Sequence, residues 1–185
     1  MNFEYSENMQ PKKWPGDFGK TKIMGTHEMD KDAPTFEAIG AVDELNSFIG
    51  LVINRTSDGQ VEDILKGVQK DLFIIGAELA GSPRREDKST NLDPDHVVRL
   101  EEVIYELDQS LKPLSSFILP GGSEESSYIH VARSICRRAE RNVIRLKKEK
   151  IINDDIVKYL NRLSYLLFQL ARRINEKHGI DEHKW

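Results

Sequence analysis

Residues 116–141 read S-F-I-L-P-G-G-S-E-E-S-S-Y-I-H-V-A-R-S-I-C-R-R-A-E-R, and they place a glycine pair directly before a helix rich in arginine. Helical spacing puts Arg133, Arg137 and Arg141 in one i, i+4 row. The opposite face carries an apolar stripe, formed by Ile129, Ala132, Cys136, Ala139 and Val143. One face of this helix is therefore predicted to join a core. The other is suited to a polyanionic ligand, because arginine's planar fork matches phosphate.

Four further segments show helical periodicity of apolar residues, and no strand-like alternation competes with them. They run from about Thr35 to Asn54, from about Gly59 to Ala80, from Pro94 to about Leu111, and from about Asp154 to Lys177.

Local signals mark the ends of these helices. Thr35, Asp93 and Ser123 are expected N-caps, because their side-chain oxygens can accept a hydrogen bond from the first turn. Gly81 and Gly179 are expected to end the helices that precede them.

Long amphipathic helices with short connections predict an all-α fold, a five-helix antiparallel bundle in one domain spanning residues 1–185. The bundle is expected at 35–178. Residues 1–34 are predicted to form an ordered arm over the active site, and the polar residues 81–92 a mobile surface loop.

Composition excludes several classes of function. A formal net charge of −4 with 31% charged residues gives no overall positive field, so we expect neither nucleic acid nor a membrane surface as partner. The single cysteine, Cys136, allows no internal disulfide and is expected to be a small buried hydrophobe in a reducing compartment. Residues 1–14 contain no apolar signal-peptide core, and no apolar run approaches the roughly 20 residues that span a bilayer. Cytoplasmic localisation is expected.

The segment P-G-D-F-G-K-T at 15–21 resembles a phosphate cradle, in which backbone N–H groups and an ammonium meet phosphate oxygens. Only two residues separate Gly16 from Gly19, and no apolar strand precedes them, so this is not a Walker A loop. An ordinary turn stays open as the alternative, and Lys31 supports the phosphate interpretation.

Polar residues on the other helices are the next candidates. Asp43 is expected to meet an arginine, because an arginine cluster needs partners to hold its side chains, whereas Glu44 is expected to be solvated. Asn161 lies beside an apolar stripe, where an amide needs partners; structural pairing and ligand contact both stay open. His130 is expected to be an ordinary hydrogen-bonded helix histidine.

The chain resembles the propanediol-utilisation type of ATP:cob(I)alamin adenosyltransferase over roughly Gly16 to Asn175. Four motifs carry the resemblance in chain order, E-A-I-G-A-V-D-E-L-N-S, F-I-L-P-G-G-S, H-V-A-R-S-I-C-R-R-A-E-R and Y-L-N-R-L-S. The resemblance implies a cobalamin adenosyltransferase-like bundle assembled as a homotrimer, with ATP and corrinoid at subunit interfaces. It implies transfer of the 5′-deoxyadenosyl group of ATP, with Mg²⁺, to the cobalt of cob(I)alamin. A corrinoid reductase and an acceptor enzyme are the further partners that it suggests.

Carried over by position, the resemblance also assigns roles. Arg137 and Asn161 resemble the family's nucleotide contacts, and Phe117 stands where an aromatic residue crowds the lower face of the corrin. Asp43 and Arg133 resemble an intersubunit ion pair. The arm residues that would wrap ATP are Gly16, Asp17, Gly19, Lys20, Thr21 and Lys31.

Arg138 and Glu140 match motif positions and are expected to support the arginine row. The chain departs from the family pattern at Pro15, Thr35 and Tyr165, where many members carry other residues, so the fine nucleotide contacts are expected to differ.

A binding protein is the main alternative, in which the bundle holds ATP and corrinoid as a cofactor chaperone or sensor. A di-iron bundle needs inward-facing Glu-x-x-His pairs, and the sequence has none at the expected positions. No metal-ligating residue is therefore assigned. The sequence also offers no nucleophile–base constellation, which agrees with a reaction whose nucleophile is the cobalt itself.

Overall fold

The structure of the chain is a computed structural model that describes residues 16–23, 28–81 and 91–185. Pro15 and the rest of residues 1–15 lie outside the described residues, as does most of the predicted mobile loop at 81–92.

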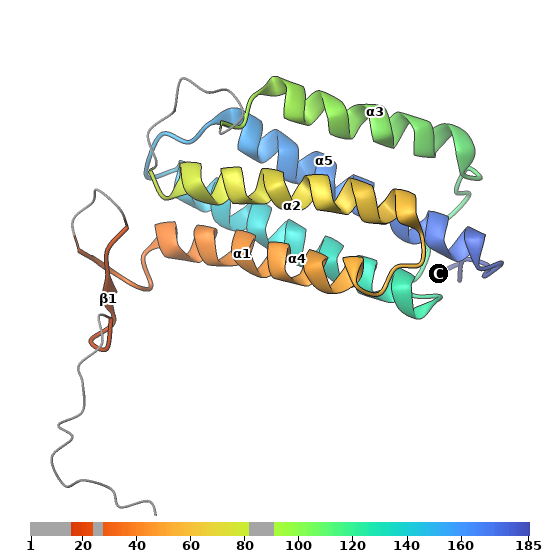
Figure 1. The fold of residues 1–185 in the computed structure, drawn as a ribbon, viewed down its shortest axis with the longest axis horizontal. Helices are drawn as coiled ribbons and strands as arrows, with labels where there is room; N and C mark the ends of the chain where they lie inside the picture. Colours follow the sequence, from red (N-terminus) through yellow and green to blue (C-terminus); the bar gives the residue numbers. More distant parts are fainter. Residues whose placement is uncertain (1–15, 24–27, 82–90) are drawn as a thin grey trace, which may run out of the picture.

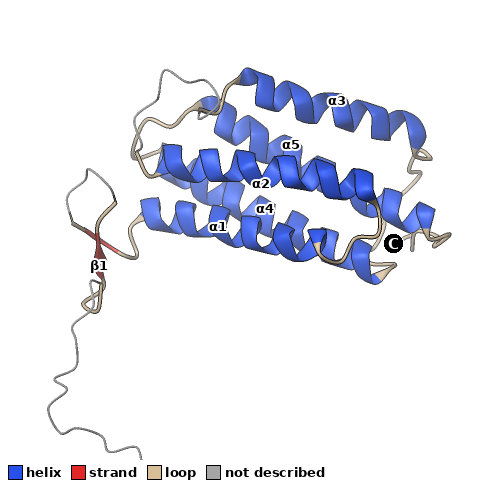
Figure 2. Cartoon of the chain, in the orientation of Figure 1, coloured by secondary structure: helices blue, strands red, loops and turns tan. Residues whose placement is uncertain are grey.

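Within the described ranges the fold consists of five helices and one small hairpin (Figures 1 and 2). The elements are β1 (Lys20–Thr21), β2 (Met29–Asp30), α1 (Pro34–Ile53), α2 (Gly59–Leu79), α3 (Pro94–Ser110), α4 (Glu124–Lys147) and α5 (Asp154–Lys177). The predicted all-α bundle is confirmed. Gly81 and Gly179 adopt φ of +81° and +65° after α2 and α5, as their role as helix stops requires. The two-residue strands were not predicted from the sequence.

Helices α1, α2, α4 and α5 form the body of the bundle, and α3 lies along α5 (Figure 1). Neighbours within this body are antiparallel, whereas α3 and α5 run in the same direction. Hydrogen bonds show this: Arg162 donates to Glu101, and further along both helices Tyr165 donates to Asp108. The reason is chain order, because α4 separates α3 from α5 and two reversals restore the direction.

Two of the three predicted caps are confirmed. Asp93 and Ser123 each accept a backbone hydrogen bond from the first turn of the helix that follows. The prediction for Thr35 was wrong: the N-cap position is Ala33, and Thr35 is buried inside the first turn. Pro34 explains the shift, because its fixed φ suits the first helical position and its missing N–H needs no cap there.

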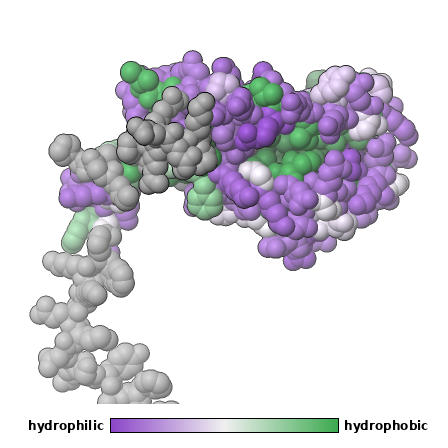
Figure 3. Space-filling model, turned by 45° about the horizontal axis from the view of Figure 1, so that its top comes forward, coloured by the Kyte–Doolittle hydropathy of each residue, from purple (hydrophilic) through white to green (hydrophobic). Residues whose placement is uncertain are grey.

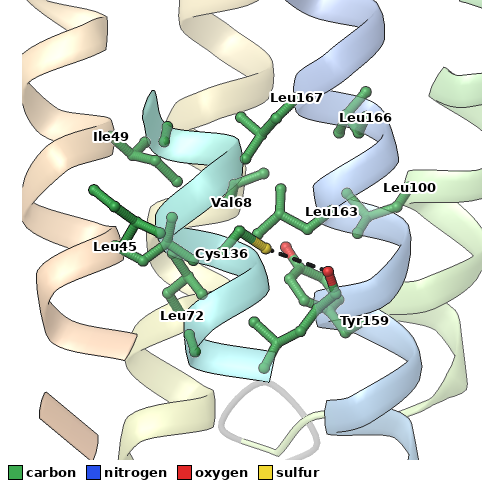
Figure 4. Packing of buried hydrophobic residues seen from close by; sticks show 14 of the residues in the cluster. Leu45, Ile49, Val68, Leu72, Leu100, Cys136, Tyr159, Leu163, Leu166 and Leu167 are labelled. Atoms are coloured by element: carbon green, nitrogen blue, oxygen red, sulfur yellow. Dashed lines mark hydrogen bonds between the residues drawn. The ribbon is translucent and has the colours of Figure 1, made fainter. Parts of the chain in front are cut away.

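The core is a continuous set of aliphatic side chains between the helices (Figure 4). Cys136 is fully buried among them, and its thiol donates a hydrogen bond to the carbonyl of Leu160 at 3.3 Å. Burial raises the pKa of the Cys136 thiol, so it stays protonated and inert. The prediction of a small buried hydrophobe is confirmed. The residues that surround it in Figure 4 include Leu45, Ile49, Val68, Leu72 and Leu163.

A buried polar cluster joins α2, α3 and α5. Tyr159 is fully buried, and its hydroxyl donates to Asp71 at 2.9 Å. His96 and Arg99 of α3 lie 3.5 and 3.7 Å from the same carboxylate. Burial raises the pKa of Asp71 and of Tyr159. Since each polar group finds a partner, the cluster fixes how α3 sits on the bundle.

Hydrophobic side chains gather in a hollow on the face seen in Figure 3, whereas the rest of that face is mostly hydrophilic. A groove between α2 and α3 is lined in part by Ile64, Val103 and Leu107. None of the helices in the described ranges combines the length and apolar character that crossing a membrane requires.

We expect Tyr159→Phe to lower the free energy of unfolding by about 1–3 kcal/mol, because the buried carboxylate of Asp71 loses its hydroxyl donor. Urea denaturation at pH 7 measures the change. Tyr105→Phe is the matched control, since Tyr105 is 66% exposed, and its effect should stay within about 0.5 kcal/mol. Equal effects of the two substitutions would contradict the role given to the Asp71 cluster.

Candidate functional site

A glycine turn fixes the start of α4. Gly121 and Gly122 adopt φ of +153° and +110°, and a Cβ on Gly122 would lie 2.3 Å from the side-chain oxygen of Asn175. The Asn175 amide donates to the carbonyl of Gly121 at 2.9 Å and accepts from the N–H of Ser123 at 3.0 Å. Glycine is therefore required here, because α5 approaches the turn too closely for a side chain.

The predicted arginine row is present on α4. Arg137 and Arg141 are exposed, whereas Arg133 is half-buried. The Nε atom of Arg133 is buried and has no hydrogen-bond partner among the described residues. Burial, together with the nearby charge of Arg137, lowers the pKa of Arg133. A buried guanidinium nitrogen without a partner indicates that a further acceptor completes this site.

A polar hollow of about 560 Å³ opens beside Arg137. The structure brings Arg137 of α4 and Asn161 of α5, the two predicted nucleotide contacts, to its wall. Its other lining residues are Glu101, Ile104, Tyr105, Asp108, Arg162, Ser164 and Tyr165.

Asn161 is held by neighbours while it lines this hollow. Its amide donates to Glu140 of α4 at 3.1 Å and accepts from Arg162 at 3.0 Å, and Arg162 donates to Glu101 at 2.8 Å. Three helices therefore orient one amide, and Glu140 contacts Asn161 rather than the arginine row that it was expected to support.

An apolar hollow of about 620 Å³ lies one helical turn away. Arg133 lies at its edge, and Phe117 forms part of its wall with a side chain that is 82% exposed. The remaining lining residues are Leu114, Ser115, Ser116, Ile118 and Phe168. The rings of Phe168 and Tyr165 lie 6.5 Å apart, so the apolar and polar hollows adjoin along α5 as well as along α4.

The two acidic residues singled out on α1, Asp43 and Glu44, are both exposed. Glu44 is exposed, as expected, and it forms a surface ion pair with Arg138 of α4. Asp43, expected to meet an arginine, is exposed, and within the described chain no ion pair joins it to Arg133. The adjacent antiparallel packing of α1 on α4 explains this, because it brings Glu44 rather than Asp43 opposite Arg138.

The arm residues come together in the small hairpin. The N–H of Gly19 donates to the carbonyl of Gly16 at 3.2 Å, and the N–H of Lys31 donates to Gly19 at 2.8 Å. A Cβ on Gly16 would lie 2.7 Å from the ammonium nitrogen of Lys31, so the glycine lets this cation approach the backbone. Lys20 and Thr21 form β1, opposite Asp30 and Met29 of β2, and Asp17 lies in the turn before it.

Within one chain the hairpin and the hollows are separate. Figure 1 shows β1 projecting beyond the end of the bundle at which α1 begins, whereas Arg137 lies in the middle of α4. The predicted meeting of Lys20 with Arg137 therefore does not occur in a single copy of the chain.

The chain matches the family model described as cobalamin adenosyltransferase over residues 13–174. The chain belongs to this family. It is 42% identical over 172 residues to a corrinoid adenosyltransferase of Bacillus subtilis, covering 90% of this chain and 87% of that relative.

Two solved structures of a PduO-type ATP:corrinoid adenosyltransferase from Lactobacillus reuteri have the same fold. A phenylalanine-to-alanine variant complexed with cobalamin and ATP gives a TM-score of 0.82 at 34% identity, covering 92% of this chain and 96% of that chain. An arginine-to-lysine variant complexed with ATP gives 0.83 at 35% identity, with the same coverage.

For this cobalamin adenosyltransferase, sequence reasoning missed three residues that shape the site. Phe168 and Arg172 lie on α5 beside the apolar hollow, and Asn175 holds the glycine turn. Phe168 and Asn175 follow the helical stripe of α5 and so could have been noticed. Arg172 gave no signal, because a buried arginine looks like a surface arginine in sequence.

His130 is buried against Phe168, with ring centroids 6.1 Å apart. Its Nδ1 atom is buried and has no hydrogen-bond partner among the described residues, so the hydrogen bond expected at that atom is not found. The His130 ring packs at 59° to the ring of Phe168, an apolar neighbour that offers no hydrogen-bond partner. Burial, with a smaller contribution from Arg133, lowers the pKa of His130 to about 4.

We expect an NMR titration to place the inflection of His130 near pH 4, with His130→Gln identifying its resonance. The native ring stays neutral while the unfolded chain takes up a proton below about pH 6.5, so this group weakens stability as the pH falls from about 6.5 toward 4. Between pH 8 and pH 5 the unaltered chain should lose about 1–2 kcal/mol more unfolding free energy than His130→Gln. An inflection near pH 6.5 would contradict the burial argument.

Proposed function

We propose that this chain transfers the 5′-deoxyadenosyl group of ATP to the cobalt of cob(I)alamin, forming adenosylcobalamin and releasing triphosphate. One observation carries the proposal: a row of guanidinium groups borders a polar hollow on one turn and an apolar hollow on the next. The reaction needs both, because a polyanionic leaving group and a flat apolar-faced corrin must meet at one point. Family membership and the relatives' substrates agree with it.

Arg137 and Asn161 are the proposed nucleotide contacts of the polar hollow. The cradle for the phosphates is proposed to come from the arm, through Gly16, Asp17, Gly19, Lys20, Thr21 and Lys31. The hairpin projects beyond the end of the bundle (Figure 1), whereas the polar hollow is lined by residues of α3, α4 and α5, so the hairpin would reach the hollow of a neighbouring copy. We therefore propose a homotrimer with ATP and corrinoid bound between subunits.

Arg133 supports this assembly. Its buried Nε has no acceptor among the described residues of its own chain, and Asp43 of α1 is exposed. A carboxylate from the adjoining copy would supply the missing acceptor, so Asp43 and Arg133 are proposed to pair across the subunit interface.

A Mg²⁺ ion is proposed to accompany ATP. Among the described residues no group of three His, Cys, Asp or Glu side chains could hold a metal. This fits Mg²⁺ held mainly by phosphate oxygens and water, which is its usual mode beside a nucleotide. Its chemistry there is to neutralise charge on the triphosphate.

Cobalt(I) is the nucleophile of the proposed reaction. Its electron pair forms the Co–C5′ bond while the C5′–O bond breaks, and the electron pair of that bond leaves with triphosphate. The chain thus needs no nucleophile of its own, and the buried, protonated Cys136 agrees with this. The task of Arg137 and Lys20 is to position the triphosphate and stabilise its growing charge.

Phe117 is proposed to act on the corrin side. Its exposed ring at the edge of the apolar hollow would cover the lower face of the corrin and exclude water and a lower axial ligand. Four-coordinate cobalt is thereby easier to reduce. A corrinoid reductase supplying Co(I) and an acceptor enzyme taking the product complete the proposal, which we place in the reducing cytoplasm.

A cofactor chaperone or sensor is the second candidate, because the same hollows could hold both molecules without reaction. Anaerobic incubation with reduced cobalamin and MgATP separates the two. Loss of the cob(I)alamin spectrum with release of triphosphate supports the transferase, and binding of both molecules without triphosphate release would overturn it.

We expect Arg137→Ala to lower kcat/KM for ATP by the equivalent of about 2–5 kcal/mol, because a charge contact to the leaving group is lost. The anaerobic assay measures it. Arg145→Ala is the control, since Arg145 is exposed in the last turn of the same helix, and it should change kcat/KM by no more than about twofold. Retained activity in Arg137→Ala would defeat its assignment.

A mixing experiment tests the shared site. We expect Lys20→Ala and Arg137→Ala to be poorly active alone. Co-expression of the two should restore activity to about a quarter of the unaltered level, because in randomly mixed trimers about one site in four combines an intact Lys20 with an intact Arg137. Co-purification of untagged Arg137→Ala with affinity-tagged Lys20→Ala checks that mixed trimers form. Mixed trimers without recovery would show that both residues serve the same copy.

A further inference from the structure

The C-terminal residues 182–185, called the strap here, run antiparallel to the segment that carries Phe117. The N–H of Leu119 donates to the carbonyl of His183 at 2.8 Å, and the N–H of Trp185 donates to the carbonyl of Phe117 at 3.0 Å. These two bonds flank a β-bridge and secure the backbone on both sides of it.

A buried arginine anchors the strap. Arg172 of α5 is 6% exposed, and its Nε donates to the carboxylate of Glu182 at 2.5 Å. Its other two nitrogens donate to the carbonyl of Lys112 at 2.5 Å and to the side chain of Gln169 at 3.0 Å. One guanidinium thus ties α5 to the strap and to the chain just after α3.

These contacts lie at both ends of the loop that forms part of the wall of the apolar hollow. The loop leaves α3 near Lys112 and reaches Phe117 before the glycine turn. The Phe117 side chain is 82% exposed, so packing of its own ring does not hold it in place. Its backbone is held instead, by Lys112 on one side and by the strap on the other. Arg172 also lies 6.0 Å from the ring of Phe168, on the wall of the same hollow.

We propose that Arg172, Glu182 and the strap are positioning elements that set the place of the Phe117 ring at the edge of the apolar hollow. The inference rests on the proposed function for its catalytic consequence. It assigns the strap an effect on the corrin step and none on the binding of ATP, because the strap contacts Arg172, Phe117 and Leu119, and these residues are not part of the lining of the polar hollow.

Amide hydrogen exchange tests the physical part without any substrate. We expect Glu182→Ala to speed exchange across residues 117–119 and 183–185. Glu182→Gln, which keeps an acceptor oxygen for Arg172, should exchange nearly as slowly as the unaltered chain. Asp181→Ala is the matched control, since it removes the neighbouring carboxylate. Unchanged exchange in Glu182→Ala would overturn the anchor.

Steady-state kinetics test the consequence. We expect Glu182→Ala to lower kcat about tenfold with the KM for ATP within about twofold, because only the corrin-facing ring is displaced. In a Phe117→Ala background the same substitution should cost less than about twofold, because the strap then has no ring to position. An equal loss in both backgrounds, or a parallel rise in the KM for ATP, would overturn the proposal.

Two substitutions at Trp185 test the backbone hydrogen bond from its N–H to the carbonyl of Phe117. Trp185→Pro removes the N–H that donates to Phe117, whereas Trp185→Ala keeps it. We expect the larger loss of kcat from proline, and equal losses would refute a role for this bond. No turnover in the unaltered chain would refute the proposed function itself, and exchange at residues 117–119 would still decide whether the strap holds this segment.

Discussion

The amphipathic character of α4, apolar on one face and cationic on the other, is the constraint on which the rest of the molecule depends. Its inner face is buried between α1 and α5, and Ala132, Cys136 and Ala139 are small enough for both neighbours to approach closely. Its outer face must then carry the arginines, because burying several unpaired guanidinium groups would be prohibitive. Apolar burial therefore aligns the cations, and the site follows from the core.

Polar side chains of α5 connect this core to the loops that complete the site. Asn175 fixes the glycine turn before α4, Arg172 fixes the loop and strap around Phe117, and Asn161 lines the polar hollow. Asn175 and Arg172 sit on the same helix as Asn161, so one rigid element sets the positions of the glycine turn, the loop and the strap relative to the polar hollow. This arrangement suits a reaction whose catalysis is mainly positioning.

Particular residues show how far sequence reasoning reached. The helix starts at Asp93 and Ser123 and the burial of Cys136 were predictable, because each follows from local chemistry or from helical periodicity. The joining of Arg137 with Asn161 was expected only from the family resemblance. Thr35 was misjudged, and the partner of the exposed Glu44 was not foreseen. In the first case a neighbouring proline replaced the cap, and in the second the register between α1 and α4 brought an arginine opposite the carboxylate. Neither effect can be read from the residue type and helical spacing of the segment alone.

The sequence by itself determined the helices, their buried faces and the chemical nature of the site, because apolar spacing, caps and arginine content are properties of short stretches. Only the tertiary structure decided that Arg172 is buried, that the strap pairs with the Phe117 segment, and that the arm stands apart from the hollows of its own chain. Those facts depend on contacts between segments far apart in sequence, such as Glu182 with Arg172 and Trp185 with Phe117, and no local pattern encodes which partner a side chain or a backbone N–H will meet.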